Sequence, residues 1–250
     1  MQGTITAILN CYRRPQNLIP QIQALLSQTV KPNDIWIWKN YHPDQELFDM
    51  DEIYKLSDDI GIRIIESNYN WKYCGRFAAA CLVDTEFTAV FDDDTICGNK
   101  WFENCLNSFN EKEGIYGGVG VNLKTKESYQ PNTRYGWVSG NEEIVEVDLV
   151  GHAWFFPASY IKYMWMEKPM WANGEDMHFS AMCQIHGGVK TYVPPHPVSD
   201  VSLWSSLYGQ QLGVDAVASS AVRNHGQFYL ERNQCVQRLV ELGWKLCEVD

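Results

Sequence analysis

The sequence predicts an α/β fold in which helices cover both faces of a mostly parallel sheet. Short apolar runs rich in β-branched and aromatic residues alternate with segments of helical spacing over the first hundred residues, and this alternation is typical of parallel sheets. The 250 residues are 45% hydrophobic and 20% charged, which is the composition of a globular protein rather than a disordered one. Because no linker rich in Pro, Gly and Ser interrupts the chain, we expect a single domain over residues 1–250.

The first half is expected to hold four strands joined by helices. Each strand is a short apolar run, and we expect strands at residues 4–9, 35–38, 62–65 and 87–91. Helices are expected at residues 17–28, around 53–56 and at 73–82. Ligands of such sheets bind beyond the carboxyl ends of the strands. The polar residues at these ends are therefore the first candidates for a site: Asn10, Asn40, Asn68 and the aspartates that begin at Asp92.

The second half is less regular and predicts a smaller group of strands followed by a closing helix. We expect strands at residues 116–121, 144–150 and 191–193, with an aromatic turn or strand at 151–157. Helical spacing occurs at residues 177–185 and 228–246. A serine-rich stretch at residues 201–223 is interrupted by glycines, which indicates a mobile segment.

Charge and composition exclude several classes of protein. There are 20 Lys+Arg against 31 Asp+Glu, a formal net charge of -11, which argues against nucleic-acid binding because that needs a basic surface. No apolar stretch reaches the roughly 20 residues that span a bilayer, and no signal-peptide pattern opens the sequence. The 8 cysteines are scattered without a CxxC pair, which indicates reduced thiols. We therefore expect a soluble, cytoplasmic protein.

Three consecutive aspartates give the strongest chemical signal. Asp92, Asp93 and Asp94 follow an apolar strand directly, and carboxylates packed this closely raise each other's proton affinity. A hard divalent cation relieves that repulsion, and oxygen ligands favour Mg²⁺ or Mn²⁺. If the backbone stays extended, Asp92 and Asp94 point to one side and Asp93 to the other. The alternative is an aspartate-rich turn that caps the next helix.

Two further signals lie in the second half. Glu175 and Asp176 follow a glycine at the start of an expected helix, where they could compensate the helix dipole or, near a ligand, deprotonate an incoming hydroxyl. His196 lies between two prolines that stiffen the backbone. Its imidazole could complete a metal shell, contact a phosphate or bond to a loop backbone. The other histidines, including His152, have no comparable local context.

Basic residues follow the first strand and open a helix. Arg13 and Arg14 could meet a phosphate or a base, and Arg76 lies at the start of a helix whose N-terminus favours anions. Taken alone, each of these arginines is better explained as an ordinary surface residue. If the side chains of these arginines lie close to the three aspartates, the functional interpretation is favoured.

The motifs together resemble a nucleotide-sugar glycosyltransferase of the GT-A fold. Residues 5–15, 35–40 and 91–95 resemble its opening strand, second strand and DxD motif, and residues 147–156 and 174–176 resemble its acceptor-side strand and acidic motif. The pattern is similar both to family 2-like inverting enzymes and to exostosin-like retaining enzymes. The QxxRW motif of family 2 polymerising synthases is absent, which argues against processive synthesis.

The resemblance implies a Rossmann-like single domain and a metal-dependent reaction. Residues 1–100 would bind the nucleotide sugar, residues 101–200 the acceptor, and residues 201–250 would form the mobile segment and closing helix. A sugar would pass from a nucleoside diphosphate, expected to be UDP, to a hydroxyl group of a glycan or glycoconjugate. The implied cofactor is Mn²⁺ or Mg²⁺, which would neutralise the leaving diphosphate.

The resemblance also implies a role for each candidate residue. The implied metal ligands are Asp92, Asp94 and His196. The implied donor-binding residues are Asn10, Tyr12, Arg13, Asn40, Arg76, Asp92 and Asp93. Asp176 would be the general base, with Glu175 as second choice.

Two other functions stay open at this point. A nucleotidyltransferase also combines an α/β sheet with acidic metal ligands, although it usually needs a glycine-rich basic loop after the first strand, and residues 10–15 contain no glycine. A carbohydrate-binding module could keep the same fold without catalysis.

Overall fold

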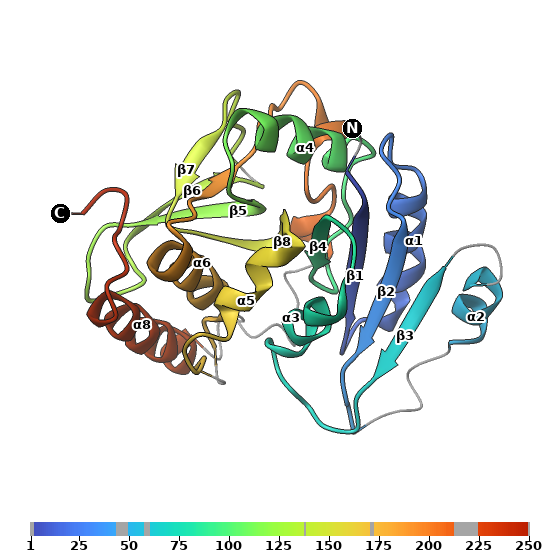
Figure 1. Cartoon of the computed structure of the whole chain (residues 1–250), viewed down its shortest axis with the longest axis horizontal. Helices are drawn as coiled ribbons and strands as arrows, with labels where there is room; N and C mark the ends of the chain where they lie inside the picture. The colour runs from blue at the N-terminus through green and yellow to red at the C-terminus, as the bar shows by residue number, and fades with distance from the viewer. Residues whose placement is uncertain are drawn as a thin grey trace.

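A computed structural model describes residues 3–43, 50–57, 61–137, 139–170, 173–212 and 225–249. It confirms the α/β class, with one nine-stranded mixed sheet whose main order is β3-β2-β1-β4-β8-β5-β9-β7, while β6 pairs with β5 (Figure 1). The strands of the second half therefore extend the same sheet as the strands of the first half.

The first four strands are parallel and bring their carboxyl ends to one edge. They are β1 (Ile5–Cys11), β2 (Asp34–Lys39), β3 (Ile62–Glu66) and β4 (Phe87–Phe91). The helices between them are η1 (Pro15–Asn17), α1 (Leu18–Leu26), α2 (Asp51–Ser57), α3 (Gly75–Ala79) and η3 (Ala80–Leu82). In the register, Leu9 of β1 pairs with Ile37 on one side and Phe91 on the other. Residues that follow these strands therefore lie beside one another.

The second half reverses the direction of pairing. Its strands are β5 (Ile115–Leu123), β6 (Asn132–Gly136), β7 (Val145–Val147), β8 (Leu149–Pro157) and β9 (Thr191–Val193). Its helices are α4 (Trp101–Glu111), η4 (Ala158–Tyr160), α5 (Ile161–Met164) and α6 (Glu175–Gly187). β8 is antiparallel to both β4 and β5, which places it at the centre of the sheet. The aromatic segment at 151–157 is thus a strand and not a turn.

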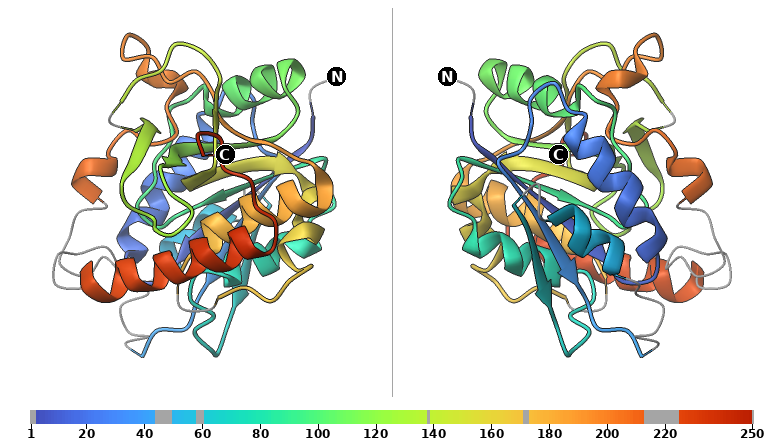
Figure 2. Two further views of the ribbon diagram at one scale, coloured as in Figure 1. Left: turned by 90° about the vertical axis from the view of Figure 1, so that its left-hand side faces the viewer. Right: turned by 90° about the vertical axis from the view of Figure 1, so that its right-hand side faces the viewer.

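Helices cover both faces of the sheet, as the views in Figure 2 show. On one face α1 and α4 bury Leu18, Ile22 and Trp101 against the strands. On the other face α3 and α6 bury Phe77 and Phe179. A third apolar cluster joins α6 to the C-terminal helix. Both faces of the central strands are therefore shielded from water, which explains why β1, β4 and β5 are buried along their whole length.

The C-terminal part contains η5 (Val201–Leu203), α7 (Gly209–Leu212) and α8 (His225–Glu241). The closing helix is confirmed, although it begins and ends earlier than its apolar spacing predicts. The expected mobile segment falls partly on residues 213–223, which lie outside the described residues. All eight cysteines are free thiols. Within the part of the chain that the structure describes, no helix has both the length and the apolar character that crossing a membrane requires.

Candidate active site

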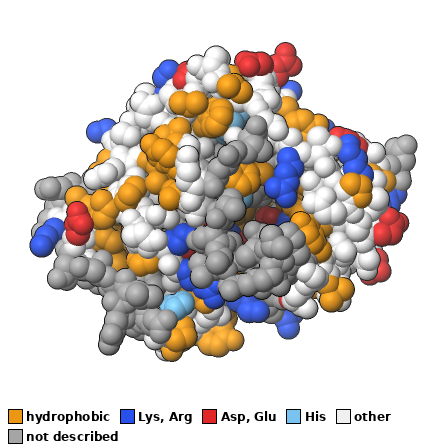
Figure 3. All heavy atoms as spheres, turned by 180° about the vertical axis from the view of Figure 1, so that it is seen from behind, with side chains coloured by type: hydrophobic (Ala, Val, Ile, Leu, Met, Phe, Trp, Pro, Cys, Tyr) orange, Lys and Arg blue, Asp and Glu red, His pale blue; other side chains and the backbone are white. Residues whose placement is uncertain are grey.

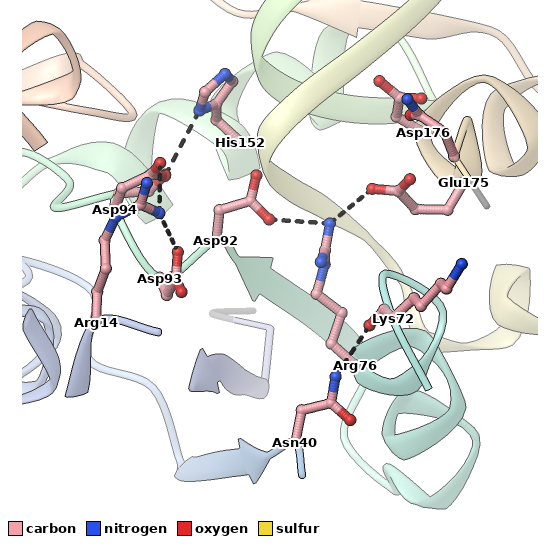
Figure 4. A network of polar contacts seen from close by, with 12 residues as sticks. Arg14, Asn40, Lys72, Arg76, Asp92, Asp93, Asp94, His152, Glu175 and Asp176 are labelled. Carbon is pink, nitrogen blue, oxygen red and sulfur yellow. Dashed lines mark hydrogen bonds and ion pairs between the residues drawn. The ribbon is translucent and has the colours of Figure 1, made fainter. Parts of the chain in front are cut away.

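Two aspartates and a histidine come together where β4 ends. One ligand atom from each of Asp92, Asp94 and His152 lies within 4.8 Å of the others. Asp93 points to the other side, where Arg14 Nη1 lies 2.6 Å from its Oδ1 and 3.2 Å from Asp94 Oδ2 (Figure 4). Asp94 therefore lies between His152 and Arg14. The chain turns at Asp93 and Asp94, so the extended backbone of β4 does not continue through the aspartates.

His152 reaches this group from β8, the antiparallel neighbour of β4. The Asp92 N–H donates to the His152 carbonyl oxygen (2.9 Å), which continues the ladder between the two strands. His152 has a φ of +65°, a conformation that costs energy for a residue with a Cβ. Its ring packs against Trp137 at 5.0 Å and its Nδ1 lies 3.8 Å from Asp94 Oδ1. Burial opposes protonation, yet the Asp94 carboxylate outweighs it and raises the pKa of the imidazole.

The donor set fits a divalent cation. Two carboxylates and one imidazole are ligands that Mn²⁺ accepts, and the carboxylates also suit Mg²⁺. The strained backbone at His152 turns its ring toward the two carboxylates, which is the kind of strain found at functional sites. The residues present therefore fit the metal that the resemblance implies.

His196 is not brought into this group. It is fully buried, and its ring stacks on Trp204 at 4.7 Å. Its backbone N–H donates to the carbonyl oxygen of Asn141 (2.7 Å), and the two residues form an isolated antiparallel bridge. Burial lowers the pKa of His196 to about 4. The flanking prolines fix a core residue here, and His152 occupies the position predicted for His196.

Arg76 links the aspartates to the second acidic pair. Its Nη2 lies 2.9 Å from Asp92 Oδ1 and 2.8 Å from Glu175 Oε1, and its guanidinium lies over the ring of Trp154 at 5.0 Å. The side chain of Arg76 is 3% exposed. Burial raises the pKa of Asp92 to about 6 and that of Glu175 to about 7, although Arg76 lowers both. Arg76 therefore acts as a shared counter-charge between β4 and α6.

Asp176 lies beside Glu175 in the first turn of α6 but has different partners. Its Oδ1 accepts the Met177 N–H (2.8 Å), and its Oδ2 accepts a hydrogen bond from Arg232 Nη2 (2.8 Å). The Asp176 side chain is 14% exposed, against 8% for Glu175. Asp176 is thus the more accessible carboxylate of the pair.

The predicted base-side residues form a separate polar network at the ends of β1 and β2. The Asn40 side chain accepts the Trp71 N–H (3.1 Å) and donates to Asn70 Oδ1 (2.9 Å) and to the Lys72 carbonyl (3.3 Å). Asn70 in turn donates to the Tyr12 hydroxyl (3.0 Å). Asn40 therefore organises the loop after β3, and a direct contact with a base stays a prediction.

Asn10 and Arg13 lie closer to the aspartates. The Asn10 side chain is buried, and its Oδ1 has no hydrogen-bond partner among the described residues. The Arg13 N–H donates to Asp93 Oδ2 (3.3 Å), while its guanidinium lies 5.2 Å from the ring centre of Tyr12. Arg14 and the Arg13 N–H both contact Asp93, so an anion could meet positive charge here in spite of the chain's net charge of -11. Lys and Arg side chains are also visible on the face shown in Figure 3, with a few Asp and Glu side chains among them.

The comparisons with known proteins agree with this geometry. The family model described as glycosyl transferase family 2 matches residues 6–167. The chain belongs to glycosyl transferase family 2. The match spans β1 through α5 and includes the three aspartates and His152, whereas Glu175 and Asp176 lie beyond it. Family membership confirms the resemblance, selects the family 2 branch and argues against a nucleotidyltransferase.

Solved structures share the fold of this family 2 domain. The crystal structure of S. aureus TarS has a TM-score of 0.55 at 12% identity, over 77% of this chain and 36% of that one. S. aureus TarS 1-349 in complex with UDP-GlcNAc has a TM-score of 0.54 at 13% identity, over 80% of this chain and 60% of that one. The chain therefore spans about a third of the length of the TarS chain in the first of these structures. At this identity the likeness shows a shared fold. No curated protein is a significant match.

Proposed function

We propose that this family 2 domain transfers a sugar from a nucleoside diphosphate sugar to a hydroxyl group of a glycan or glycoconjugate. The observation that carries the proposal is the cluster of Asp92, Asp94 and His152, which Arg76 joins to Glu175. The proposed metal site is thus linked through Arg76 to Glu175, the residue that precedes the proposed base Asp176. A UDP-sugar is the proposed donor, since a TarS structure of the same fold is a complex with UDP-GlcNAc.

Asp92, Asp94 and His152 would hold Mn²⁺ or Mg²⁺. When bound, the metal supplies positive charge that stabilises the departing diphosphate. Arg14 contacts both Asp93 and Asp94, and the Arg13 N–H contacts Asp93, so both arginines lie beside the aspartates and would attract the same anion. Asp93, which these two residues contact, keeps them near the phosphate region.

Asp176 is the proposed general base. Each carboxylate pairs with one arginine, Glu175 with Arg76 and Asp176 with Arg232, but the Asp176 side chain is the more exposed of the two. The carboxylate of Asp176 would accept the proton of the acceptor hydroxyl while that oxygen bonds to the anomeric carbon. The bond from that carbon to the diphosphate oxygen breaks on the opposite face, so the configuration inverts.

A release assay tests the proposal. The protein should release UDP from at least one member of a UDP-sugar panel with MnCl₂ and candidate glycans, and EDTA should stop the release. Asp176→Asn should keep donor binding, measured by calorimetry, and lose turnover by about 100-fold or more. A folded protein that releases no nucleoside diphosphate from any donor contradicts the proposed function. Full turnover by Asp176→Asn contradicts only the choice of base.

A further inference from the structure

The C-terminal helix α8 packs against the start of α6 at very short range. A Cβ built on Gly174 would lie 2.6 Å from Cys235 Sγ of α8, and that thiol donates to the Gly174 carbonyl oxygen (3.6 Å). Gly174 also has a φ of +94°, which favours glycine. The turn that presents Glu175 and Asp176 is therefore held directly by α8, a helix outside the residues matched by the family model.

Arg232 extends from α8 to the acidic pair. Its Nη2 donates to Asp176 Oδ2 (2.8 Å) and its Nη1 lies 3.3 Å from Asn173 Oδ1. The guanidinium lies 4.0 Å from the ring centre of Tyr129 and 5.5 Å from that of Phe228. Arg232 is 5% exposed. A planar group held by two acceptors and two rings has little freedom to rotate.

These contacts fix the orientation of the Asp176 carboxylate. Oδ1 accepts the Met177 N–H and Oδ2 accepts Arg232, so each oxygen has one fixed donor and one remaining lone pair. The atom Oδ2 lies 3.9 Å from the place a Cβ would take at Gly151. Because Gly151 precedes His152 on β8, Oδ2 faces the strand that carries the candidate metal ligand.

We propose that Arg232 is a positioning residue, which holds Asp176 in the orientation that proton transfer requires and makes α8 part of the active site. This inference rests on the proposed function, in which Asp176 is the base. A buried ion pair is by itself weak evidence for a stabilising role. The position of a general base relative to the acceptor hydroxyl, in contrast, affects the rate directly. A displacement of the base by about 1 Å can lower the rate by about 100-fold.

The variants Arg232→Lys and Arg232→Gln test the inference, with Arg238→Gln as the matched control. Lysine keeps the positive charge but cannot donate to Asp176 and Asn173 with a planar fork. The assay is release of UDP from the donor that the wild-type protein uses, and calorimetry gives the donor affinity. We expect kcat to fall by about 10- to 100-fold in Arg232→Lys, with donor Kd and acceptor KM within about threefold of wild type. Arg238→Gln, on the same helix, should keep the wild-type kcat.

A double variant separates positioning from a general loss of structure. If Arg232 acts through Asp176, Arg232→Lys in an Asp176→Asn background should cause no further loss of rate. A wild-type kcat in a folded Arg232→Lys protein overturns the inference, as does a full additional loss in the double variant. Failure of the wild-type protein to release UDP from any donor contradicts the proposed function instead. In that case a crystal structure of Arg232→Lys decides, since an unmoved Asp176 carboxylate overturns the inference without reference to turnover.

Discussion

Replacing Arg76 with methionine should destabilise the protein in a strongly pH-dependent way. Methionine keeps much of the side-chain volume over Trp154 but leaves the buried carboxylates of Asp92 and Glu175 without the cation that lies 2.9 and 2.8 Å from them. Removing one partner of a buried ion pair costs about 3–5 kcal/mol. A chain of this size loses about 2–4 °C in Tm for each kcal/mol, so we expect Tm at pH 8 to fall by about 6–20 °C.

The pH dependence follows from the raised pKa values of the two carboxyl groups. Burial raises the pKa of Asp92 to about 6 and that of Glu175 to about 7 while Arg76 is present, and Arg76 lowers both. Without Arg76 both pKa values should rise further. A carboxyl whose pKa is higher in the folded state contributes stability that is complete below its unfolded pKa and is lost as the pH rises through its folded pKa. The cost of the substitution should therefore shrink at low pH, where neutral carboxyls leave a penalty of about 1–3 kcal/mol.

Urea unfolding followed by tryptophan fluorescence measures the free energy of unfolding of the wild type and of Arg76→Met at pH 5 and at pH 8. Arg63→Met is the control, since Arg63 is 61% exposed and lies 3.8 Å from Asp34, and an exposed pair of this kind contributes at most about 1 kcal/mol. The pH effect should be absent from this control. An equal loss of stability at pH 5 and pH 8 in Arg76→Met would refute the reasoning, because it would show that the charge of the two carboxylates does not matter.

Three further predictions concern the metal, a tight contact and a buried histidine. His152→Ala should weaken Mn²⁺ binding by about tenfold or more in calorimetry, and an unchanged affinity would exclude His152 as a ligand. Gly174→Ala should lower the free energy of unfolding, measured in urea, by about 1–3 kcal/mol, because the φ of Gly174 is +94° and the new Cβ would meet Cys235. In the control Gly226→Ala the new Cβ has no atom within 4 Å, and we expect no loss of stability. His196→Phe should reduce the acid sensitivity of unfolding. The pKa of about 4 means that the wild-type protein loses about 3 kcal/mol as pH falls from 6.5 to 4, so an equally steep loss in the variant would contradict this account.

The fold was predictable where local pattern and environment agree. The four parallel strands are apolar runs because they are buried on both faces, and the structure confirms all four within two residues at each end. β6 was not predicted, since Asn132–Gly136 has no apolar alternation. It forms a strand because its backbone pairs antiparallel with that of β5. The helix at Trp101–Glu111 was also missed, because polar Asn104 and Ser108 are among its buried residues and interrupt its apolar spacing.

The site was predictable only where its residues are neighbours in sequence. Asp92 and Asp94 follow one strand directly, so their nearness to each other was predictable from the sequence, whereas the turn at Asp93 and Asp94 was not. His152 joins them because β8 returns antiparallel to β4, a pairing that no local signal reveals. Likewise Arg232 meets Asp176 through the packing of α8 on α6, 56 residues away in sequence. The one available hint was the resemblance of residues 147–156 to an acceptor-side strand, because His152 lies within that segment.

The arrangement of charges explains how an acidic chain can hold a dense acidic site. Five carboxylates occupy positions 92–94 and 175–176, and burial alone would drive several of them to the neutral form. Three arginines from three different elements offset this: Arg14 contacts Asp93 and Asp94, Arg76 contacts Asp92 and Glu175, and Arg232 contacts Asp176. None of the three is adjacent in sequence to the carboxylate it contacts, so these pairings form only when the sheet and α8 are assembled. The proposed cation binding and proton transfer therefore depend on contacts between distant segments, including the helix beyond the family match.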